Sequence, residues 1–256
     1  MFKSLRILAL LIVLMSVLGT YLLQQNINKN WSGTRSIQII PVYADDKQST
    51  RDFIASIKAD DFQEIISYLE QNASVYNLDL SNALLIDLQA PIDEVPPALP
   101  NTDDGYLSQI WWSLKLRWWA WRHESSNHSD TQIRLFVMYQ SPAENIRLPH
   151  STGLRNGLLG LINARAQRSD KRLHNVILTH ELLHIYGATD KYDLVTGEPL
   201  FPQGYFKPEQ QPVLPQRYAE LMGRSIPISN TKFKVAGRLS QTRIGELTAR
   251  EIGWLE

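Results

Sequence analysis

The stretch from residue 180 to residue 193 constrains this chain most, because it reads His-Glu-Leu-Leu-His-Ile-Tyr-Gly-Ala-Thr-Asp-Lys-Tyr-Asp. Apolar residues recur at helical spacing from Leu173 onward, and Ser169 or Asp170 can cap the start, which predicts a helix. His180 and His184 then lie four residues apart and project from one face of it. Two imidazoles placed in this way are ready nitrogen ligands for a tetrahedral Zn²⁺.

Three further residues complete the predicted metal centre. Gly187 can adopt the left-handed conformation that ends a helix, so Asp190 can swing back as the third ligand. The fourth position is then left to water, as in catalytic zinc sites. Glu181 is offset around the helix, where it can act as the general base on that water without binding the metal. The alternative, an ordinary amphipathic helix with two partly exposed histidines, is disfavoured by the added Gly187 and Asp190.

The motif His-Glu-x-x-His-x-x-Gly-x-x-Asp, which begins at His180, resembles the zinc motif of the metzincin clan of metallopeptidases. Within that clan it resembles the minority with aspartate as third ligand, such as the snapalysins. Immune-inhibitor-A-type peptidases have a similar Asp-x-Tyr run. Snapalysin-like enzymes carry a tyrosine two residues after that aspartate, where Tyr192 stands. Met222, within Tyr-Ala-Glu-Leu-Met-Gly, is similar to the methionine of the clan's Met-turn.

The resemblance covers His180 to Arg224 and implies both a fold and a set of roles. The implied fold is α+β: a metzincin-like zincin domain with a mixed twisted sheet, an active-site helix, a Met-turn and a C-terminal helix. Tyr192 would donate a hydrogen bond to the developing oxyanion, and Met222 would form a hydrophobic floor. Packing beside the turn is the alternative role for Tyr192, and membership of the core is that for Met222.

The ligand set has open alternatives. Asp193 also lies within reach of the metal, so the sequence does not decide between it and Asp190. A downstream glutamate, Glu209 or Glu220, is a lesser alternative. An aspartate ligand makes the site harder than three histidines would, so another metal can be considered besides Zn²⁺. The carboxylates of Asp193, Glu198 and Glu209 could include Ca²⁺ ligands, although their spacing fits no EF-hand.

Composition excludes several other classes of function. The 256 residues include 26 basic and 26 acidic side chains, so the neutral chain gives no sign of nucleic-acid binding. The absence of cysteine excludes disulfides, iron–sulfur clusters and thiol catalysis. The oligomeric state cannot be predicted from these features.

The N-terminus predicts a membrane anchor. Lys3 and Arg6 precede an uncharged, mainly apolar run from Ile7 to Leu23. Its length is at the lower limit for a helix that spans a bilayer. Basic residues before the run predict a cytoplasmic N-terminus and an extracytoplasmic catalytic domain, periplasmic or extracellular. We therefore expect a single-pass membrane protein with an anchor over 1–23, a stem over 24–34 and a catalytic domain over 35–256. Cleavage after Gly19 would instead give a secreted protein.

Periodicity predicts the elements of the domain. Strands are expected over 36–42, 84–88, 132–139 and 157–164, and helices over 50–58, 61–76, 109–122 and 241–255. By resemblance, Gly157 to Asn163 is the candidate edge strand that would hold an extended peptide substrate. A buried strand whose glycines allow close packing is the equal alternative.

Five tryptophans lie in the predicted helix over 109–122. Such a helix can dock on a bilayer surface, because tryptophans with basic residues suit the headgroup zone. It can also line a groove for a peptide or partner. The third interpretation is that the tryptophans fill the core above the sheet, as aromatic stripes commonly do.

These features together predict a zinc-dependent endopeptidase that acts on a peptide or protein substrate. Metal-activated water would attack the peptide bond, with Glu181 as general base. The alternative is a membrane-anchored zinc-binding scaffold, or a peptide-binding protein, without turnover. Glu181 favours the enzyme, because a purely structural site has no need of a base.

Overall fold

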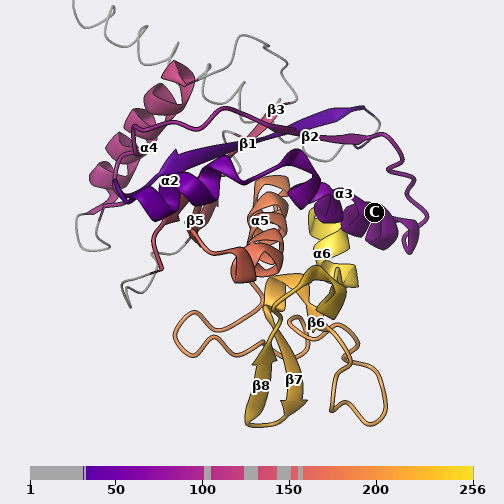
Figure 1. Cartoon of the computed structure of the whole chain (residues 1–256). Helices are drawn as coiled ribbons and strands as arrows, with labels where there is room; N and C mark the ends of the chain where they lie inside the picture. Colours follow the sequence, from indigo (N-terminus) through magenta and orange to yellow (C-terminus); the bar gives the residue numbers. More distant parts are fainter. Residues whose placement is uncertain are drawn as a thin grey trace, which may run out of the picture.

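The computed structural model describes residue 31 and residues 33–100, 105–123, 132–142, 151–154 and 158–255. In this part of the chain, helices cover both faces of a mixed β-sheet (Figure 1). This arrangement confirms the predicted α+β class. The finer expectation of a metzincin-like fold stays a prediction.

The main sheet has five strands in the spatial order β2-β1-β3-β5-β4. Their bounds are β1 Arg35–Tyr43, β2 Leu84–Leu88, β3 Gln132–Gln140, β4 Thr152–Leu154 and β5 Leu159–Arg165. The first four in that spatial order run parallel, and β4 pairs antiparallel with β5 at one edge. The sequence predicts all of these strands except β4, which falls in a segment without a strand pattern.

The predicted substrate-binding edge is wrong. Residues 157–163 were expected to form the edge of the sheet, but β5 lies between β3 and β4, and residue 157 lies outside the described residues. The alternative, a buried strand, is therefore the one that the structure shows for β5. The edge beside the histidine helix belongs to β4.

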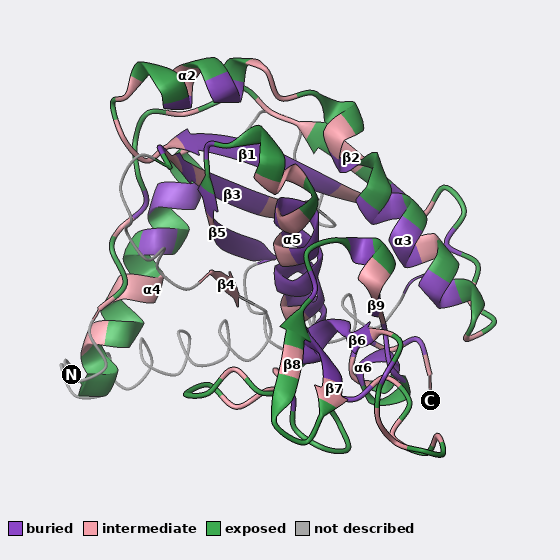
Figure 2. Ribbon diagram, turned by 60° about the horizontal axis from the view of Figure 1, so that its bottom comes forward, coloured by how far each residue is buried: buried purple, intermediate pink, exposed green. Residues whose placement is uncertain are grey.

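The central strands separate two hydrophobic cores. In β1, Ile37 and Ile39 pack into the larger core, whereas Ile40 and Val42 point to the other face. The helices on the first face are α2 Gln48–Ala55, α3 Gln63–Ser74 and α5 Lys171–Tyr186. The helix α4, Gly105–Arg122, covers the second face. Because both faces are covered, β1 is buried along most of its length, as Figure 2 shows.

The chain after α5 forms small elements around the end of that helix (Figure 1). They are β6 Ala219–Glu220 paired with β9 Thr242–Arg243, the hairpin β7 Ser225–Ser229 with β8 Lys232–Val235, and α6 Glu246–Glu251. Short 3₁₀ turns occur at Ala59–Phe62, Arg168–Asp170, Leu221–Gly223 and Leu239–Gln241. The predicted closing helix over 241–255 is thus much too long. Thr242 and Arg243 are extended in β9, and the observed helix α6 ends at Glu251, shortly before Gly253, which has a φ of 80°.

The predicted anchor, residues 1–23, lies outside the described residues, as does most of the predicted stem. Among the helices that the structure describes, none combines the length and the apolar character needed to cross a bilayer. The prediction of a single-pass membrane protein is therefore not supported, and we do not retain it.

One residue of the predicted stem belongs to the core instead. Trp31 is buried, and its ring lies 4.2 Å from that of Tyr186, centre to centre. Its indole N–H donates to the carbonyl oxygen of Ile252 over 2.8 Å. Trp31 therefore joins the end of α5 to the residues that follow α6.

Candidate metal centre

The helix α5 carries the two histidines and ends as the sequence predicts. Gly187 follows Tyr186 with φ 107° and ψ 7°, in the left-handed region that favours glycine. The N–H groups of Gly187 and Ala188 donate to the carbonyls of His184 and Leu183, which closes the last turn. The predicted side-chain cap at the other end is wrong, because Asp170 occupies that position without a capping hydrogen bond.

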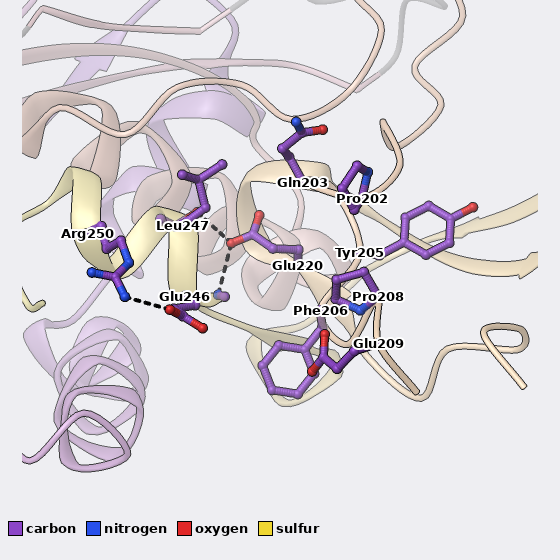
Figure 3. A pocket seen from close by; sticks show the side chains of 12 residues that line it. Pro202, Gln203, Tyr205, Phe206, Pro208, Glu209, Glu220, Glu246, Leu247 and Arg250 are labelled. Carbon is purple, nitrogen blue, oxygen red and sulfur yellow. Dashed lines mark hydrogen bonds and ion pairs between the residues drawn. The ribbon is translucent and has the colours of Figure 1, made fainter. Parts of the chain in front are cut away.

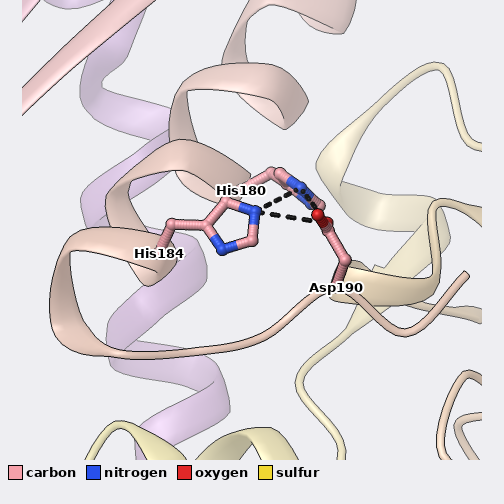
Figure 4. Close-up of side chains that lie close together, drawn as sticks. All are labelled: His180, His184 and Asp190. Atoms are coloured by element: carbon pink, nitrogen blue, oxygen red, sulfur yellow. Dashed lines mark hydrogen bonds and ion pairs between the residues drawn. The ribbon is translucent and has the colours of Figure 1, made fainter. Parts of the chain in front are cut away.

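His180, His184 and Asp190 converge beyond this turn (Figure 4). The Nε2 atoms of the histidines lie 3.0 Å apart, and Asp190 Oδ1 lies 3.1 Å from that of His180 and 3.2 Å from that of His184. Ligand atoms bound to a tetrahedral ion at 2.0–2.1 Å lie about 3.3 Å from one another. The three side chains therefore form a group that could hold a metal ion.

The contacts of the two Nδ1 atoms determine which nitrogen of each ring can act as an acceptor toward the centre. His184 Nδ1 lies 2.8 Å from the carbonyl oxygen of Ala188, and His180 Nδ1 lies 3.3 Å from that of Leu221. A carbonyl only accepts, so each Nδ1 carries the hydrogen and each neutral ring keeps a lone pair on Nε2. Two lone pairs and the Asp190 carboxylate then face one another, which only a cation or added protons can stabilise. This donor set fits a metal.

A second network holds the loop that carries Asp190. Its two neighbours in sequence, Thr189 and Lys191, are both bound by the carboxylate of Glu251 at the end of α6. Glu251 accepts from Thr189 N over 3.0 Å and from its hydroxyl over 2.7 Å. It also accepts from Lys191 Nζ over 2.7 Å, and that side chain is only 2 % exposed. This clamp therefore binds the backbone and side chain of Thr189 on one side of Asp190 and the side chain of Lys191 on the other.

Glu181 lies beside the centre and faces β4. Its side chain is buried, and Oε2 has no hydrogen-bond partner in the part of the chain that the structure describes, whereas the backbone of Gly153 in β4 is hydrogen-bonded to the carboxyl group. Gly153 passes so close to α5 that a Cβ there would lie 2.5 Å from the backbone oxygen of Glu181 and 2.9 Å from His184 Cβ. Glycine is therefore needed at this crossing of strand and helix.

One open cavity of about 390 Å³ contains all five predicted site residues. Its lining residues are Ser151, Thr152, Gly153, His180, Glu181, His184, Asp190, Tyr192 and Leu194. The edge strand β4 forms one wall, and the loop after α5 forms the other. The centre is therefore accessible from outside between these two segments.

Tyr192 lies over the centre and is held from outside by Arg224. The two ring centres of His180 and Tyr192 are 6.2 Å apart, and the Arg224 guanidinium carbon lies 4.7 Å from the Tyr192 ring centre. The Tyr192 hydroxyl is hydrogen-bonded to both Asp190 and Arg224. Burial, and then the Asp190 charge, raise the pKa of Tyr192, so the hydroxyl keeps its proton near neutral pH. Arg224 itself has a φ of 63°, an uncommon value for a residue with a side chain.

The carboxyl groups of the site have pKa values shifted in opposite directions. Burial raises the pKa of Glu181, although the nearby histidines and the Gly153 hydrogen bond oppose the shift. Burial would also raise that of Asp190, but when no metal is bound and the rings take up protons, hydrogen bonds from His180 and His184 and their positive charge outweigh it and hold the pKa well below its usual range. Asp190 is therefore suited to remain a charged ligand, and Glu181 is suited to exchange a proton.

The predicted Met-turn packs directly under the centre. Met222 is fully buried in the 3₁₀ turn Leu221–Gly223, whose Leu221 carbonyl contacts His180. Glu220, just before this turn, is buried and fully occupied: it accepts from Gly223 N, Gly245 N and the Thr248 hydroxyl. Burial raises the pKa of this carboxyl. Glu220 thus joins the turn to α6 and does not reach the metal centre.

The other ligand alternatives do not join the histidines either. Asp193 accepts from the backbone N–H groups of Val195 and Thr196, which keeps its carboxylate in a local turn. Glu209 lines a second cavity, of about 340 Å³, which also contains Glu220 and Arg250 but none of the five site residues (Figure 3). Within the described residues, the candidate calcium ligands Asp193, Glu198 and Glu209 form no metal-binding group of their own.

Several contributors to this site have no signal in the sequence. Gly153 lies in a strand of three residues, too short to show alternation, and Glu251 acts from 60 residues beyond Lys191. Arg224 follows the 3₁₀ turn Leu221–Gly223, where nothing in the neighbouring sequence points to Tyr192. No protein-family model matches the chain, and no curated protein matches it either.

Proposed function

We propose that this protein is a zinc-dependent peptidase that hydrolyses peptide bonds at the centre formed by His180, His184 and Asp190. The observation that carries the proposal is the convergence of three acceptor atoms within 3.2 Å of one another, beside a buried carboxyl group whose Oε2 has no partner within the described residues. A site that only stored a metal would have no use for that fourth group.

Zn²⁺ is the metal that this donor set suits best. Two imidazole nitrogens and one carboxylate oxygen are common ligands of catalytic zinc, which keeps a further position open. Bound there, the ion would act as a Lewis acid that polarises a carbonyl group and makes water easier to deprotonate. The chain's own part is to fix the three ligands, which the Ala188 and Leu221 carbonyls and the Glu251 clamp do.

Glu181 is the general base of the proposed reaction. Its buried Oε2 has no partner among the described residues, so it is free to accept a proton from water in the cavity. Its raised pKa makes the protonated form accessible, and the same group can then deliver the proton to the departing amine. The Gly153 hydrogen bond to this carboxyl group keeps it oriented toward the cavity.

Tyr192 is the proposed donor to the oxyanion. Its hydroxyl stays protonated near neutral pH and lies at the rim of the same cavity. Arg224 holds the ring from outside and adds positive charge to this side of the site. The loss of one such donor commonly costs about 3 kcal/mol in transition-state stabilisation.

The substrate is proposed to be a peptide in extended conformation along β4. This strand is the edge of the sheet, and its residues Thr152 and Gly153 line the cavity next to Glu181. An edge strand can bind an extended peptide through backbone hydrogen bonds. The role first assigned to residues 157–163 thus passes to β4.

The test separates metal binding from catalysis. Asp190→Ala should lower zinc content, whereas Glu181→Gln should keep zinc and lose at least roughly 100-fold in peptide cleavage. Glu198→Gln, an exposed carboxylate in the loop after α5, is the matched control and should change neither. If Glu181→Gln cleaves a broad peptide mixture at the wild-type rate, the peptidase proposal fails. A protein that binds zinc but cleaves nothing would instead support the scaffold alternative.

A further inference from the structure

The helix α4 exposes a larger set of apolar side chains than any other element that the structure describes. Three of its five tryptophans are more than half exposed: Trp111 at 60 %, Trp118 at 57 % and Trp121 at 64 %. The other exposed apolar residues of the helix are Tyr106, Leu107, Ile110 and Leu114. Figure 1 shows that the first half of α4 stands away from the sheet. No part of the proposed peptidase site involves this surface.

The exposed and buried residues lie on opposite sides of the helix. Leu107, Trp111, Leu114, Trp118 and Trp121 follow one another at intervals of four and three residues, which places them in a single stripe. Leu116 and Trp119 lie on the other side, where the Trp119 ring packs against Phe136 in β3 at 4.7 Å between centres. The core-filling interpretation therefore holds for Trp119 and, in part, for Trp112, but it is wrong for the other three tryptophans.

The charges of α4 are all of one sign. Residues 105–122 contain Lys115, Arg117 and Arg122 and no acidic residue, in a chain with equal numbers of basic and acidic side chains. Lys115 Nζ lies 5.5 Å from the Trp111 ring centre, and the Arg122 guanidinium carbon lies 4.8 Å from that of Trp118. Glu94 approaches Arg122 at 3.6 Å, but both side chains are about half exposed, so this pair neutralises the helix only weakly.

We propose that α4 docks on the surface of an anionic lipid bilayer, with its axis in the plane of the membrane and the stripe in the headgroup zone. Tryptophan and tyrosine are enriched in that zone, because their rings are apolar and their N–H or O–H groups remain hydrated. Basic residues beside the rings meet lipid phosphates of opposite charge. The charge complementarity favours an anionic lipid surface over an apolar protein groove. This proposal does not depend on the peptidase function.

The absence of cysteine in the chain allows a direct test on the full-length protein. Leu114→Cys places a single label site in the stripe, and Val75→Cys, an exposed position after α3, provides the matched control. Each variant is labelled with a polarity-sensitive dye and mixed with vesicles of phosphatidylcholine and phosphatidylglycerol. The label at position 114 should shift to an apolar spectrum and be quenched by a lipid-soluble quencher, whereas the label at position 75 should remain in water.

Each other result overturns the proposal. A label at position 114 that stays in water with vesicles shows that the stripe does not meet lipid. An apolar spectrum without vesicles that depends on protein concentration indicates a second copy of the chain. An apolar spectrum without vesicles at every concentration indicates cover by another segment of the same chain.

Substitutions of the exposed residues test the two chemical components separately. Replacement of Trp111, Trp118 and Trp121 by serine should reduce lipid contact of the position-114 label at least roughly tenfold, measured as the vesicle concentration for half-maximal shift. Lys115→Gln with Arg122→Gln should weaken binding to anionic vesicles by roughly 25-fold at low salt, and hardly alter it for pure phosphatidylcholine. Val195→Ser, which removes an exposed apolar side chain elsewhere, should change neither value. Unchanged lipid contact in the tryptophan variant would contradict the role of the stripe.

Discussion

The helices α4 and α5 lie on opposite faces of one sheet and depart from amphipathic patterning in opposite ways. α5 buries five polar side chains in its middle turns: His174, Asn175, Thr179, His180 and Glu181. α4 exposes three tryptophans while it buries a fourth. An ordinary surface helix would do neither, because it places apolar residues inside and polar residues outside.

The two departures differ in what compensates them. On α5, several of the buried polar groups have partners inside the protein: Asn175 donates to the carbonyl of Asp61, in a distant segment, over 3.0 Å, and Thr179 donates to the Asn175 carbonyl one turn earlier in the same helix over 2.7 Å. On α4, Trp111 lies next to Lys115 and Trp118 next to Arg122, and both of these cations belong to the same helix. Buried polar side chains that have partners inside the protein indicate a prebuilt centre. Exposed apolar side chains indicate instead a surface that binds another molecule.

The largest expected difference is in the unfolding free energy that is lost when an ion pair is removed, near the α5 site or on α4. Glu251→Ala would leave the ammonium of Lys191 buried without its carboxylate, which should cost about 3–5 kcal/mol of unfolding free energy. Glu94→Ala, which removes the exposed partner of Arg122 on α4, should cost less than about 1 kcal/mol. Urea unfolding of both variants measures this contrast. Equal losses would mean that the clamp beside Asp190 is no more important than a surface pair.

The same clamp should also affect the metal. Because Glu251 binds both neighbours of Asp190, Glu251→Gln should weaken zinc binding by roughly 10- to 100-fold, as outer partners of metal ligands commonly do. Titration of zinc against a competing chelator gives this value. An unchanged affinity would show that Asp190 is held in place by other contacts.

His174 should make the stability of the α5 side depend on pH. Burial lowers its pKa from 6.5 to about 4, with a small opposing effect of Asp170. The unfolded chain then binds this proton more tightly than the folded one, so the stabilising contribution is complete above pH 6.5 and is lost as the pH falls toward 4. The loss should reach about 3 kcal/mol, at 1.36 kcal/mol per pKa unit.

His174→Phe provides the comparison for that prediction. Its neighbours Phe53 and Tyr139 are aromatic, so a neutral ring can take the same position. The unfolding free energy of this variant, measured by urea at a series of pH values, should fall less steeply between pH 6.5 and pH 4 than that of the wild type. Parallel curves would assign the acid sensitivity to other groups.

The close approach of β4 to α5 should be sensitive to a single methyl group. Gly153→Ala would place a Cβ against the backbone oxygen of Glu181, so the strand or the helix must shift, at a cost of about 1–3 kcal/mol. Gly33→Ala is the control, since nothing lies within 4 Å of a Cβ there. Thermal unfolding compares the two variants. If Gly153→Ala is as stable as its control and cleaves peptides normally, the strand does not need to lie this close.

The metal group could be predicted because it is local. His180 and His184 are fixed by the period of one helix, and Gly187 supplies a turn whose conformation is specific to glycine. The choice between Asp190 and Asp193 could not be made, because it depends on which backbone N–H groups bind Asp193 and on the Glu251 clamp. Both are properties of the folded chain.

The central strands and the first helices were predictable for a similar reason, since their patterns are long and regular. The edge strand and the closing helix were not. β4 has three residues, and the segment before α6 is extended because it pairs with β6. For α4, the sequence placed tryptophans on more than one side of the helix, so it could not show which side faces the sheet.

The smallest expected effect is on the stability of α4 itself. Trp118→Ser removes a ring that is 57 % exposed, so the unfolding free energy should change by less than about 0.5 kcal/mol. Trp119→Ala, one position further, removes a ring that is 2 % exposed and packs on Phe136, and should cost about 3–5 kcal/mol. Urea unfolding without lipid measures both. A large loss in Trp118→Ser would mean that the ring is already covered within the protein, and the contrast between α4 and α5 would disappear.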